Sequence, residues 1–311
     1  MSKDIMLLSS VPTFMMNDLQ QEYVLHDHAH ILDPEAFTKV TAFVGVGSTS
    51  KVDRKLLSMF PNVKMISIFG VGYDGIDVAA AQEKGVKVTH TPDVLTDDVA
   101  DLAMGLILSI GRRIPQSDKF VRNGDWVSEP YTMTHKVTGT RLGLVGFGRI
   151  GQAIAKRAAA FDMTIAYTGR RAKTNAPFRY YPTASELAAN SDYLVVAVPG
   201  GNETKNMINA QVLKALGPKG IVINIARGSV IDQTALIQAL KDKSIAGAGL
   251  DVFWDEPNID PQFFKLHNVV LTPHNGSNTH ETRRAMADLA LANLKAFFDE
   301  QPLLTLIPEC Q

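Results

Sequence analysis

The chain has 311 residues, and its 31 Lys and Arg nearly balance its 32 Asp and Glu without forming a basic block. This length favours two globular domains, and the balanced charge argues against nucleic acid or an anionic membrane as a main partner. Cys310 is the single cysteine, which excludes a disulfide framework and a cysteine-based metal site. Because no apolar run reaches the length of about 18 residues that a membrane span needs, we expect a soluble, cytoplasmic protein with a small-molecule ligand.

The first part of the chain alternates short apolar runs with helix-like segments. The runs lie at residues 5–8, 42–46, 65–69 and 86–90. Such alternation is typical of parallel strands that are joined by helices. The sequence therefore predicts an α/β domain in this region.

A histidine-rich stretch, HDHAH, follows the first of these runs. It places His26, His28 and His30 at alternate positions, so that they would share one face of a strand. No nearby Cys or Glu completes a set of metal ligands. We interpret the stretch as polar surface and predict no metal site.

Two long helices are predicted outside the strand pattern. The first covers residues 96–111, with Thr96 as N-cap, acidic residues in the first turn and Gly111 as the stop. Apolar residues cover nearly every face of this helix, so we expect it to be buried between domains or subunits. The second covers residues 281–298 and has no strand after it, so it can pack back on the first domain.

A glycine-rich loop opens a second set of apolar runs, at 141–146, 163–168, 193–198, 220–225, 246–252 and 268–272. Gly146, Gly148 and Gly151 have the GxGxxG spacing, between a strand and a helix that begins near Ile150. Backbone N–H groups at a helix N-terminus favour a pyrophosphate. A tight turn without a ligand has the same spacing, but the β/α units that follow favour a Rossmann site for a dinucleotide.

The end of the next strand indicates which dinucleotide is bound. An NAD site usually has Asp or Glu roughly 20 residues after the first glycine. Here the positions are Thr168, Gly169, Arg170 and Arg171. Guanidinium groups suit a ribose phosphate, which a carboxylate would repel. The sequence therefore predicts NADPH, and a solvated basic loop is the alternative.

Three residues that can act on a 2-oxo acid follow later strands. Arg227, Glu256 and His274 can converge, because ligands of open α/β sheets bind beyond the carboxyl ends of the strands. Arg227 would hold a substrate carboxylate and polarise its ketone. His274 would donate a proton, and Glu256 would orient the imidazole and favour its charged form. Taken singly, each residue also has a structural interpretation as a cap, a turn residue or a hydrogen-bond partner.

Six stretches together resemble the D-isomer-specific 2-hydroxyacid dehydrogenases, in unchanged order from about Val44 to the last helix. They are GVGYDGID, TPDVLTDDVADLAMGLIL, GLVGFGRIGQAIAKR, INIARGSVID, LDVFWDEP and TPHNGS. The resemblance implies Arg227, Glu256 and His274 in the roles above, with the backbone N–H groups of Val71 and Gly72 holding the substrate carboxylate.

The same resemblance implies two Rossmann-like domains and a cofactor site. The substrate domain would be flavodoxin-like and discontinuous, residues 1–97 plus 285–311, around an NADP-binding domain of residues 98–284. The helix at 98–110 would lie in a homodimer interface. The implied cofactor contacts are Gly146, Gly148, Arg149, Ile150, Gly151, Thr168, Gly169, Arg170, Arg171, Val198, Pro199, Thr204, Ala226, Arg227, Asp251, His274 and Gly276.

Within the family, the sequence is most similar to NADPH-dependent glyoxylate/hydroxypyruvate reductases and to relatives that reduce hydroxyphenylpyruvate. The implied activity is reduction of glyoxylate, hydroxypyruvate or aromatic pyruvates to D-2-hydroxy acids. Tyr73 and Asn275 depart from the smaller residues that are usual at their positions and would shape the pocket, and Trp126 fits a pocket wall or a packing anchor. Two alternatives stay open: an NAD(H)-sensing, corepressor-like binding protein, and an NAD-dependent dehydrogenase of another acid.

Overall fold

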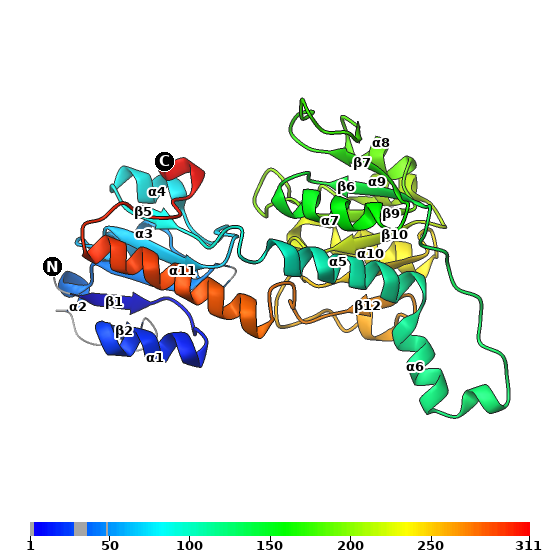
Figure 1. Ribbon diagram of the computed structural model, residues 1–311, viewed down its shortest axis with the longest axis horizontal. Coiled ribbons are helices and arrows are strands. Elements are labelled where there is room, and N and C mark those ends of the chain that lie inside the picture. Colours follow the sequence, from blue (N-terminus) through cyan, green and yellow to red (C-terminus); the bar gives the residue numbers. More distant parts are fainter. Residues whose placement is uncertain (1–2, 28–35, 48) are drawn as a thin grey trace. The chain divides into compact units, whose positions relative to one another are not determined.

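The computed structural model describes residues 3–27, 36–47 and 49–311. The chain divides into two compact units: unit 1 comprises Met1–Leu95 and Thr279–Gln311, and unit 2 comprises Thr96–Asn278. Each unit contains one parallel sheet flanked by helices (Figure 1), which confirms the predicted α/β class. The divisions fall where two helices begin, close to the predicted boundaries at 97 and 285.

The sheet of unit 1 has the strand order β2-β1-β3-β4-β5, with every neighbouring pair parallel. Its strands are β1 (Asp4–Leu7), β2 (Val24–Asp27), β3 (Ala42–Val46), β4 (Met65–Phe69) and β5 (Lys87–Thr89). β4 is buried along its whole length, as expected for a strand covered on both faces. The sequence did not predict β2, because this short edge strand is partly exposed and lacks a long apolar run.

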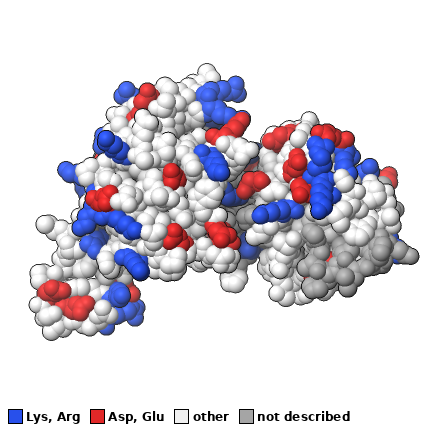
Figure 2. Space-filling view, turned by 180° about the vertical axis from the view of Figure 1, so that it is seen from behind, with Lys and Arg blue, Asp and Glu red and all other residues white. Residues whose placement is uncertain are grey.

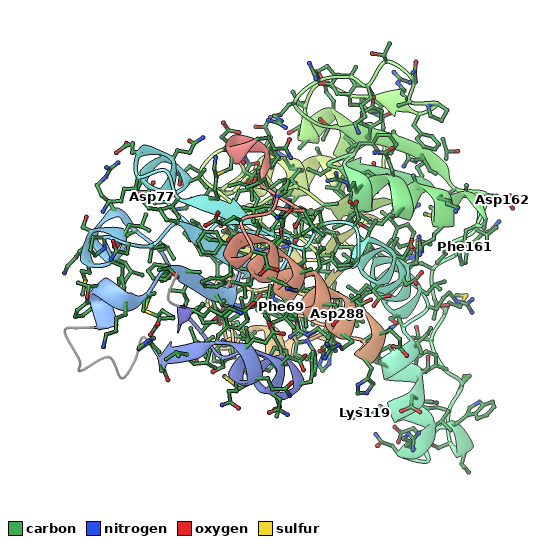
Figure 3. All side chains as sticks on the ribbon, turned by 60° about the vertical axis from the view of Figure 1, so that its left-hand side comes forward. Phe69, Asp77, Lys119, Phe161, Asp162 and Asp288 are labelled. Carbon is green, nitrogen blue, oxygen red and sulfur yellow. The ribbon has the colours of Figure 1, made fainter. Side chains whose placement is uncertain are left out.

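Helices cover both faces of this sheet. They are α1 (Thr13–Glu22), α2 (Ala36–Lys39), α3 (Arg54–Met59), α4 (Val78–Glu83) and α11 (His280–Phe298). Ile66 and Ile68 of β4 face a core that they share with α3 and α4. On the opposite face, the Ser67 hydroxyl donates a hydrogen bond of 3.2 Å to the carbonyl of Ala290 in α11, and Figure 3 shows Phe69 beside the same helix. The last helix therefore packs on the first sheet, as predicted.

The sheet of unit 2 has the strand order β12-β11-β10-β9-β6-β7-β8 and is also parallel throughout. Its strands are β6 (Arg141–Val145), β7 (Thr164–Thr168), β8 (Arg179–Tyr180), β9 (Tyr193–Val196), β10 (Ile221–Asn224), β11 (Gly247–Leu250) and β12 (Val269–Leu271). The chain order reverses between β6 and β9. In an open α/β sheet, this switch point is where a ligand binds, beyond the carboxyl ends of the strands.

Helices also cover both faces of the second sheet. They are α5 (Thr96–Gly111), α7 (Arg149–Ala159), α8 (Ala184–Ala189), α9 (Ala210–Leu216) and α10 (Gln233–Lys241). α6 (Ile114–Arg122) follows α5 and buries none of its residues. Short 3₁₀ turns lie at η2 (Asp125–Val127), η3 (Gly228–Val230), η4 (Phe263–Lys265) and η5 (Pro308–Cys310). α8, α9 and α10 enclose the main apolar core of this unit.

The predicted helix at 96–111 is present as α5, and its apolar residues are buried within unit 2. It packs against β10, β11 and α7. Arg157 of α7 bonds Asp97 at 3.0 Å and Asp101 at 2.5 Å, both in the first two turns of α5. This ion pair fixes α5 beside the helix that follows the glycine-rich loop.

The surface carries both signs of charge. Figure 2 shows Lys and Arg interspersed with Asp and Glu over the visible face, as the balanced composition predicts. Among the helices of the described residues, none combines the length and the apolar character that a membrane crossing requires.

Candidate active site

The glycine-rich loop joins β6 to α7, and the local geometry differs at each of its three glycines. Gly146 has a φ of 102°, and a Cβ there would lie 2.5 Å from the Ala197 carbonyl oxygen. A Cβ on Gly151 would lie 2.3 Å from the Gly146 oxygen, whereas nothing lies within 4 Å of a Cβ on Gly148. The backbone around Gly146 and Gly151 therefore leaves no room for a side chain, whereas the space beside Gly148 is open. This open space lies at the start of α7, where a pyrophosphate can bind.

The loop after β9 borders this turn, at the switch point of the sheet. The Val198 side chain lies 2.9 Å from the position of a Cβ on Gly146. The Thr204 hydroxyl donates a hydrogen bond of 2.7 Å to the carbonyl of Pro199, which closes the loop on itself. Three of the predicted cofactor contacts thus lie in the loop that flanks the glycines.

The loop after β7 lies next to the glycine-rich loop and carries positive charge. Phe147 stacks on Tyr167, with ring centres 4.5 Å apart, and the Lys173 ammonium lies 5.6 Å from the Phe147 ring centre. Arg170 and Arg171 follow the buried end of β7 and are exposed. A cationic loop at this strand end fits a ribose phosphate and lacks the carboxylate of an NAD site.

His274 and Glu256 are in direct contact. The Nδ1–H of His274 donates a hydrogen bond of 2.6 Å to Oε2 of Glu256, and Oε1 accepts one of 2.8 Å from the backbone N–H of Phe253. Burial alone would raise the pKa of Glu256, but the hydrogen bond and charge of His274, the Phe253 N–H and the charge of Arg227 lower it overall. The carboxylate is thus held ionised and orients the imidazole, leaving Nε2 as the ring nitrogen that can face a reactant.

Asp251 shapes the loop that carries His274. Its side chain, 1% exposed, accepts hydrogen bonds from the Thr272 hydroxyl at 2.6 Å, the Asn275 N–H at 2.7 Å and the Gly276 N–H at 2.9 Å. Burial raises the pKa of Asp251, while these bonds and the charge of His274 act in the opposite direction. The family resemblance implied Asp251 as a cofactor contact. The structure shows that its carboxylate also accepts the hydrogen bonds that hold the loop of His274.

Arg227 lies in the neighbouring loop, after β10. Asn224, buried at the strand end, donates to the Arg227 carbonyl at 2.9 Å and accepts from the Ala226 N–H at 3.1 Å. A Cβ on Gly228 would lie 2.0 Å from the backbone of Phe253, so this loop abuts the one that carries Glu256. Since β10, β11 and β12 are adjacent, the loops of Arg227, Glu256 and His274 lie side by side at one edge of the sheet.

Comparison with known proteins identifies the family. Residues 104–276 match the sequence model of the D-isomer specific 2-hydroxyacid dehydrogenase, NAD binding domain. The chain is also 51% identical to hydroxyphenylpyruvate reductase of Plectranthus scutellarioides, over 86% of this chain and 85% of that one. The chain belongs to the D-isomer-specific 2-hydroxyacid dehydrogenases.

Further relatives of this dehydrogenase have similar lengths. It is 44% identical to glyoxylate/hydroxypyruvate reductase A of Arabidopsis thaliana, with 97% of each chain covered. Among solved structures, it is similar to an NADPH-dependent glyoxylate/hydroxypyruvate reductase of Sinorhizobium meliloti in complex with NADP and malonate, at 40% identity and a TM-score of 0.94, covering 100% of this chain and 98% of that one. These comparisons confirm the resemblance that the motifs indicated.

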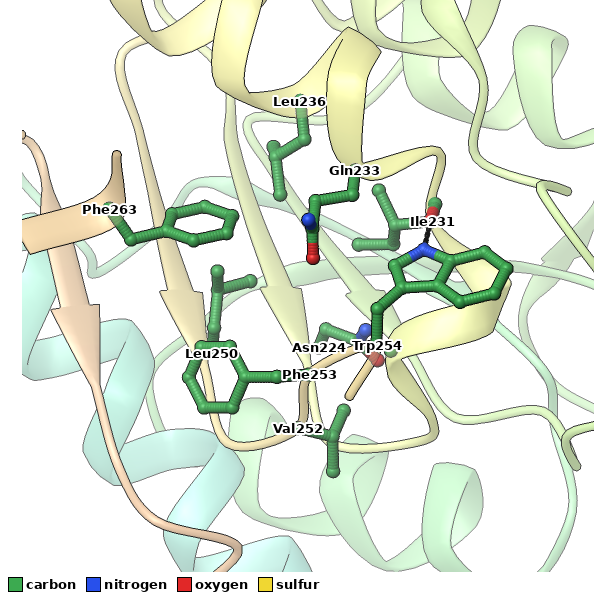
Figure 4. Close-up of a pocket in the computed structure, with 10 residues that line it drawn as sticks. Asn224, Ile231, Gln233, Leu236, Leu250, Val252, Phe253, Trp254 and Phe263 are labelled. Atoms are coloured by element: carbon green, nitrogen blue, oxygen red, sulfur yellow. Dashed lines mark hydrogen bonds between the residues drawn. The ribbon is translucent and has the colours of Figure 1, made fainter. Parts of the chain in front are cut away.

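Trp254 supports the Glu256 loop of the dehydrogenase from behind, and the sequence had not singled it out. Its indole N–H donates a hydrogen bond of 3.1 Å to the Ile231 carbonyl (Figure 4), and the Lys205 ammonium lies 5.6 Å from its ring centre. Figure 4 shows Phe253 and Phe263 among the residues that line the same pocket as Trp254. The only sequence signal for this anchor is an aromatic pair directly before the acidic residues.

Several other residues that the sequence singled out lie in unit 1. Val71 and Gly72 follow β4, in one loop. Tyr73, which the sequence predicts to shape a pocket, donates its hydroxyl to the Glu309 carboxylate at 3.0 and 3.2 Å. His26 pairs with Asp4 at 2.7 Å, whereas His28 and His30 lie outside the described residues. Among the residues that are described, no group of three or more His, Cys, Asp or Glu is arranged to hold a metal.

Proposed function

We propose that this dehydrogenase reduces small 2-oxo acids to D-2-hydroxy acids with NADPH. The relatives named above are reductases of glyoxylate, hydroxypyruvate or hydroxyphenylpyruvate, and one of the similar structures contains NADP. The observation that carries the proposal is the His274–Glu256 pair at 2.6 Å, beside the loop of Arg227. A proton donor, an orienting carboxylate and a guanidinium are the groups that ketone reduction next to a carboxylate needs.

The glycine-rich loop and the loop after β7 would hold the cofactor. The N-terminus of α7 would bind the pyrophosphate through backbone N–H groups, and Arg170 and Arg171 would bind the ribose phosphate. When bound, NADPH supplies the hydride for the keto carbon. The other predicted contacts, from the loops after β9, β10, β11 and β12, would position its nicotinamide half.

The substrate would be held and protonated by a small set of groups. The N–H groups of Val71 and Gly72 and the Arg227 guanidinium would bind the carboxylate, and Arg227 would also polarise the ketone. His274 would donate the proton on Nε2 to the developing alkoxide. Glu256, ionised beside Nδ1, would stabilise the imidazolium before transfer and keep the ring aligned.

Unit 1 would then be the substrate domain and unit 2 the cofactor domain. We further propose a homodimer, because apolar side chains are exposed along α6 and the segment after it, among them Trp126 and the 95% exposed Val127 and Met133. That residues 98–110 contribute to this interface stays a prediction. A single cysteine in the chain supports a cytoplasmic location.

The proposed function is tested by following the absorbance of the reduced nicotinamide. The purified protein is mixed with NADPH or NADH and with glyoxylate, hydroxypyruvate or 4-hydroxyphenylpyruvate. We expect oxidation of NADPH with at least one acid, and slower oxidation of NADH. Binding of NADPH without turnover on any acid would favour the sensor alternative, and a preference for NADH would favour a dehydrogenase of another acid.

A further inference from the structure

The loop at residues 70–73, here called the carboxylate loop, is held by the end of β5. The hydroxyl of Thr91 accepts a hydrogen bond of 3.0 Å from the N–H of Gly70, and the Gly70 carbonyl accepts one of 2.8 Å from the N–H of Thr91. His90, 8% exposed, donates from Nδ1 to the Val71 carbonyl at 3.0 Å. His90 and Thr91, the two residues directly after β5, thus fix the first half of the loop.

The hydrogen bond from His90 determines the direction in which the backbone N–H of Gly72 points. The Val71 carbonyl and the Gly72 N–H belong to one planar peptide group and point in opposite directions. Fixing the carbonyl against His90 therefore fixes the direction of the Gly72 N–H, which the proposed function assigns to the substrate carboxylate. On its other side the loop touches the turn after β3, because a Cβ on Gly47 would lie 1.9 Å from the Gly72 oxygen.

His90 is in turn held by residues 304–309, here called the C-terminal brace. The His90 N–H donates to the Thr305 carbonyl at 3.1 Å, and the Thr305 hydroxyl donates to the His90 carbonyl at 2.6 Å. Asn293 of α11, 0% exposed, accepts from the N–H groups of Leu304 and Thr305 at 3.0 and 3.1 Å. The brace is therefore anchored to a buried side chain of the last helix.

The brace also contacts β5 through backbone bonds. Leu306 forms an antiparallel bridge with Thr89, and the Ile307 N–H donates to the Val88 carbonyl at 3.0 Å. Ile307 is buried in the core of unit 1. The position of β5, and of His90 after it, thus depends on backbone bonds from the end of the chain.

Tyr73 gives the brace a second contact with the loop. Its ring packs edge-on against His90, with centres 5.6 Å apart, and its hydroxyl donates to Glu309. Burial and the bond to Glu309 raise the pKa of Tyr73 to about 12, so the phenol remains a donor near neutral pH. Glu309 is itself held, because its backbone carbonyl accepts a hydrogen bond from the Gln82 amide of α4.

We propose that the C-terminal brace positions the carboxylate loop and thereby sets the affinity for the carboxylate of the 2-oxo acid. This inference rests on the proposed function of Val71 and Gly72. Glu309, Tyr73 and His90 are positioning residues, since each acts on the Gly72 N–H through another group.

The test uses Tyr73→Phe, which removes the bond to Glu309 and keeps the ring on His90. Loss of a hydrogen bond worth about 1 kcal/mol corresponds to a roughly fivefold change in affinity. We expect KM for glyoxylate, or for the best substrate, to rise about fivefold, while kcat and the Kd of NADPH stay within about twofold. The control is Tyr23→Phe, which removes the hydroxyl of a buried tyrosine of unit 1 that packs on Phe298.

Substitutions of Glu309, the acceptor of this hydrogen bond, provide a conservative variant that should restore the affinity and a double-mutant cycle with Tyr73→Phe. Glu309→Ala is expected to raise KM as Tyr73→Phe does, whereas Glu309→Gln, which keeps an acceptor oxygen, restores most of the affinity. Because both changes remove one bond, the double variant should not exceed either single variant. Unchanged KM in an active enzyme, additive effects, or a fall in kcat with constant KM would each overturn the inference and leave the proposed function standing.

Amide hydrogen exchange tests the link without a substrate. Glu309→Ala is expected to speed the exchange of the amides of residues 70–73 while the amides of β6 stay protected. Unchanged exchange in the loop would overturn the inference. If instead the loop exchanges faster but the unaltered protein oxidises NADPH with no 2-oxo acid, the proposed function fails and only the positioning of the loop stands.

Discussion

His274 is held in a backbone conformation that is costly for its residue type. Its φ is 54°, in the left-handed region, where a non-glycine residue loses roughly 1 kcal/mol or more. The bonds from Thr272, Asn275 and Gly276 to Asp251 close the loop around this residue. Local backbone strain of this kind persists where the surroundings fix it, and here it aims an imidazole at Glu256.

Removing the charge of Glu256 separates the electrostatic effect of its carboxylate from its effect on the orientation of the His274 ring. Glu256→Gln keeps an oxygen that can accept from Nδ1 but no longer stabilises an imidazolium. We expect kcat/KM to fall roughly tenfold, or ~1.4 kcal/mol, because the proton donor loses the negative charge beside its Nδ1. The measurement is a pH series of initial rates beside unaltered enzyme.

His274→Gln serves as the comparison for that series. Loss of the proton donor is expected to lower kcat by roughly 10²–10⁴-fold, with NADPH binding nearly intact. Near-normal turnover of this variant would show that another group donates the proton. A Glu256→Gln profile that coincides with the unaltered one would show that the carboxylate acts through position alone.

The sequence predicted the residues with chemical roles but not the residues that hold their loops in place. Arg227, Glu256 and His274 could be selected because each follows a strand, and strand ends of one sheet meet at one edge. The structural roles of Thr272 and Trp254 depend on bonds to residues that lie 21 and 23 positions away in the chain. No local pattern encodes such partners. Tyr73 shows the same limit, because its partner Glu309 lies at the other end of the sequence.

Among the elements, the loop after β7 carries the proposed choice of cofactor. Replacing both Arg170 and Arg171 by Ser removes two cations that would bind the ribose phosphate. Charge-assisted hydrogen bonds contribute about 1.5–3 kcal/mol each, so we expect the Kd of NADPH to rise at least about tenfold and that of NADH to change little. Fluorescence titration with both cofactors measures this.

A matched change elsewhere on unit 2 separates a local effect from net charge. Lys214 and Lys219 are exposed, in α9 and just after it, and Lys214→Ser with Lys219→Ser removes the same charge. This pair of changes is expected to leave NADPH affinity unaltered. Equal losses in both double variants would point to the overall field of the protein rather than to the loop.

The elements that the sequence did not predict share a physical feature. β8 has two residues and β2 has four, so neither offers an apolar run that stands out from a loop. α6 is short and buries none of its residues, so packing against a core does not mark it in the sequence. The strands that were predicted include all the central ones, which are covered on both faces, and the edge strands β5 and β12, which keep a short apolar run.

For the whole molecule, the exposed apolar segment after α6 leads to a prediction about assembly. The unaltered chain, 33.9 kDa in mass, is expected to sediment as a dimer. Trp126→Ser combined with Val127→Ser should weaken the dimer, since buried apolar area contributes about 25 cal/mol per Å². Sedimentation velocity over a range of concentrations measures the change.

The control for assembly is Phe264→Ser, another exposed apolar residue of unit 2 that lies in η4. It should leave the sedimentation unchanged. A monomeric unaltered protein would refute the homodimer, and a dimer that survives the double change would place the interface on another surface.

The division into two units was partly within reach of the sequence. Its ends coincide with helix starts, where Thr96 and Thr279 precede acidic first turns, and such caps are local signals. That the last helix can pack on the first domain followed from the absence of a strand after it, and the family resemblance added the discontinuous domain with its boundaries. Nothing local in an apolar helix specifies which of two sheets it covers.

Because α11 completes the first sheet, translation imposes an order on folding. A ribosome finishes all of unit 2 before it makes the helix that covers Ser67 and Phe69. Unit 2 is continuous and can fold as it emerges, whereas the nascent first sheet keeps one apolar face uncovered during that interval. The half-finished sheet is therefore the part of the newborn chain that a chaperone would shield.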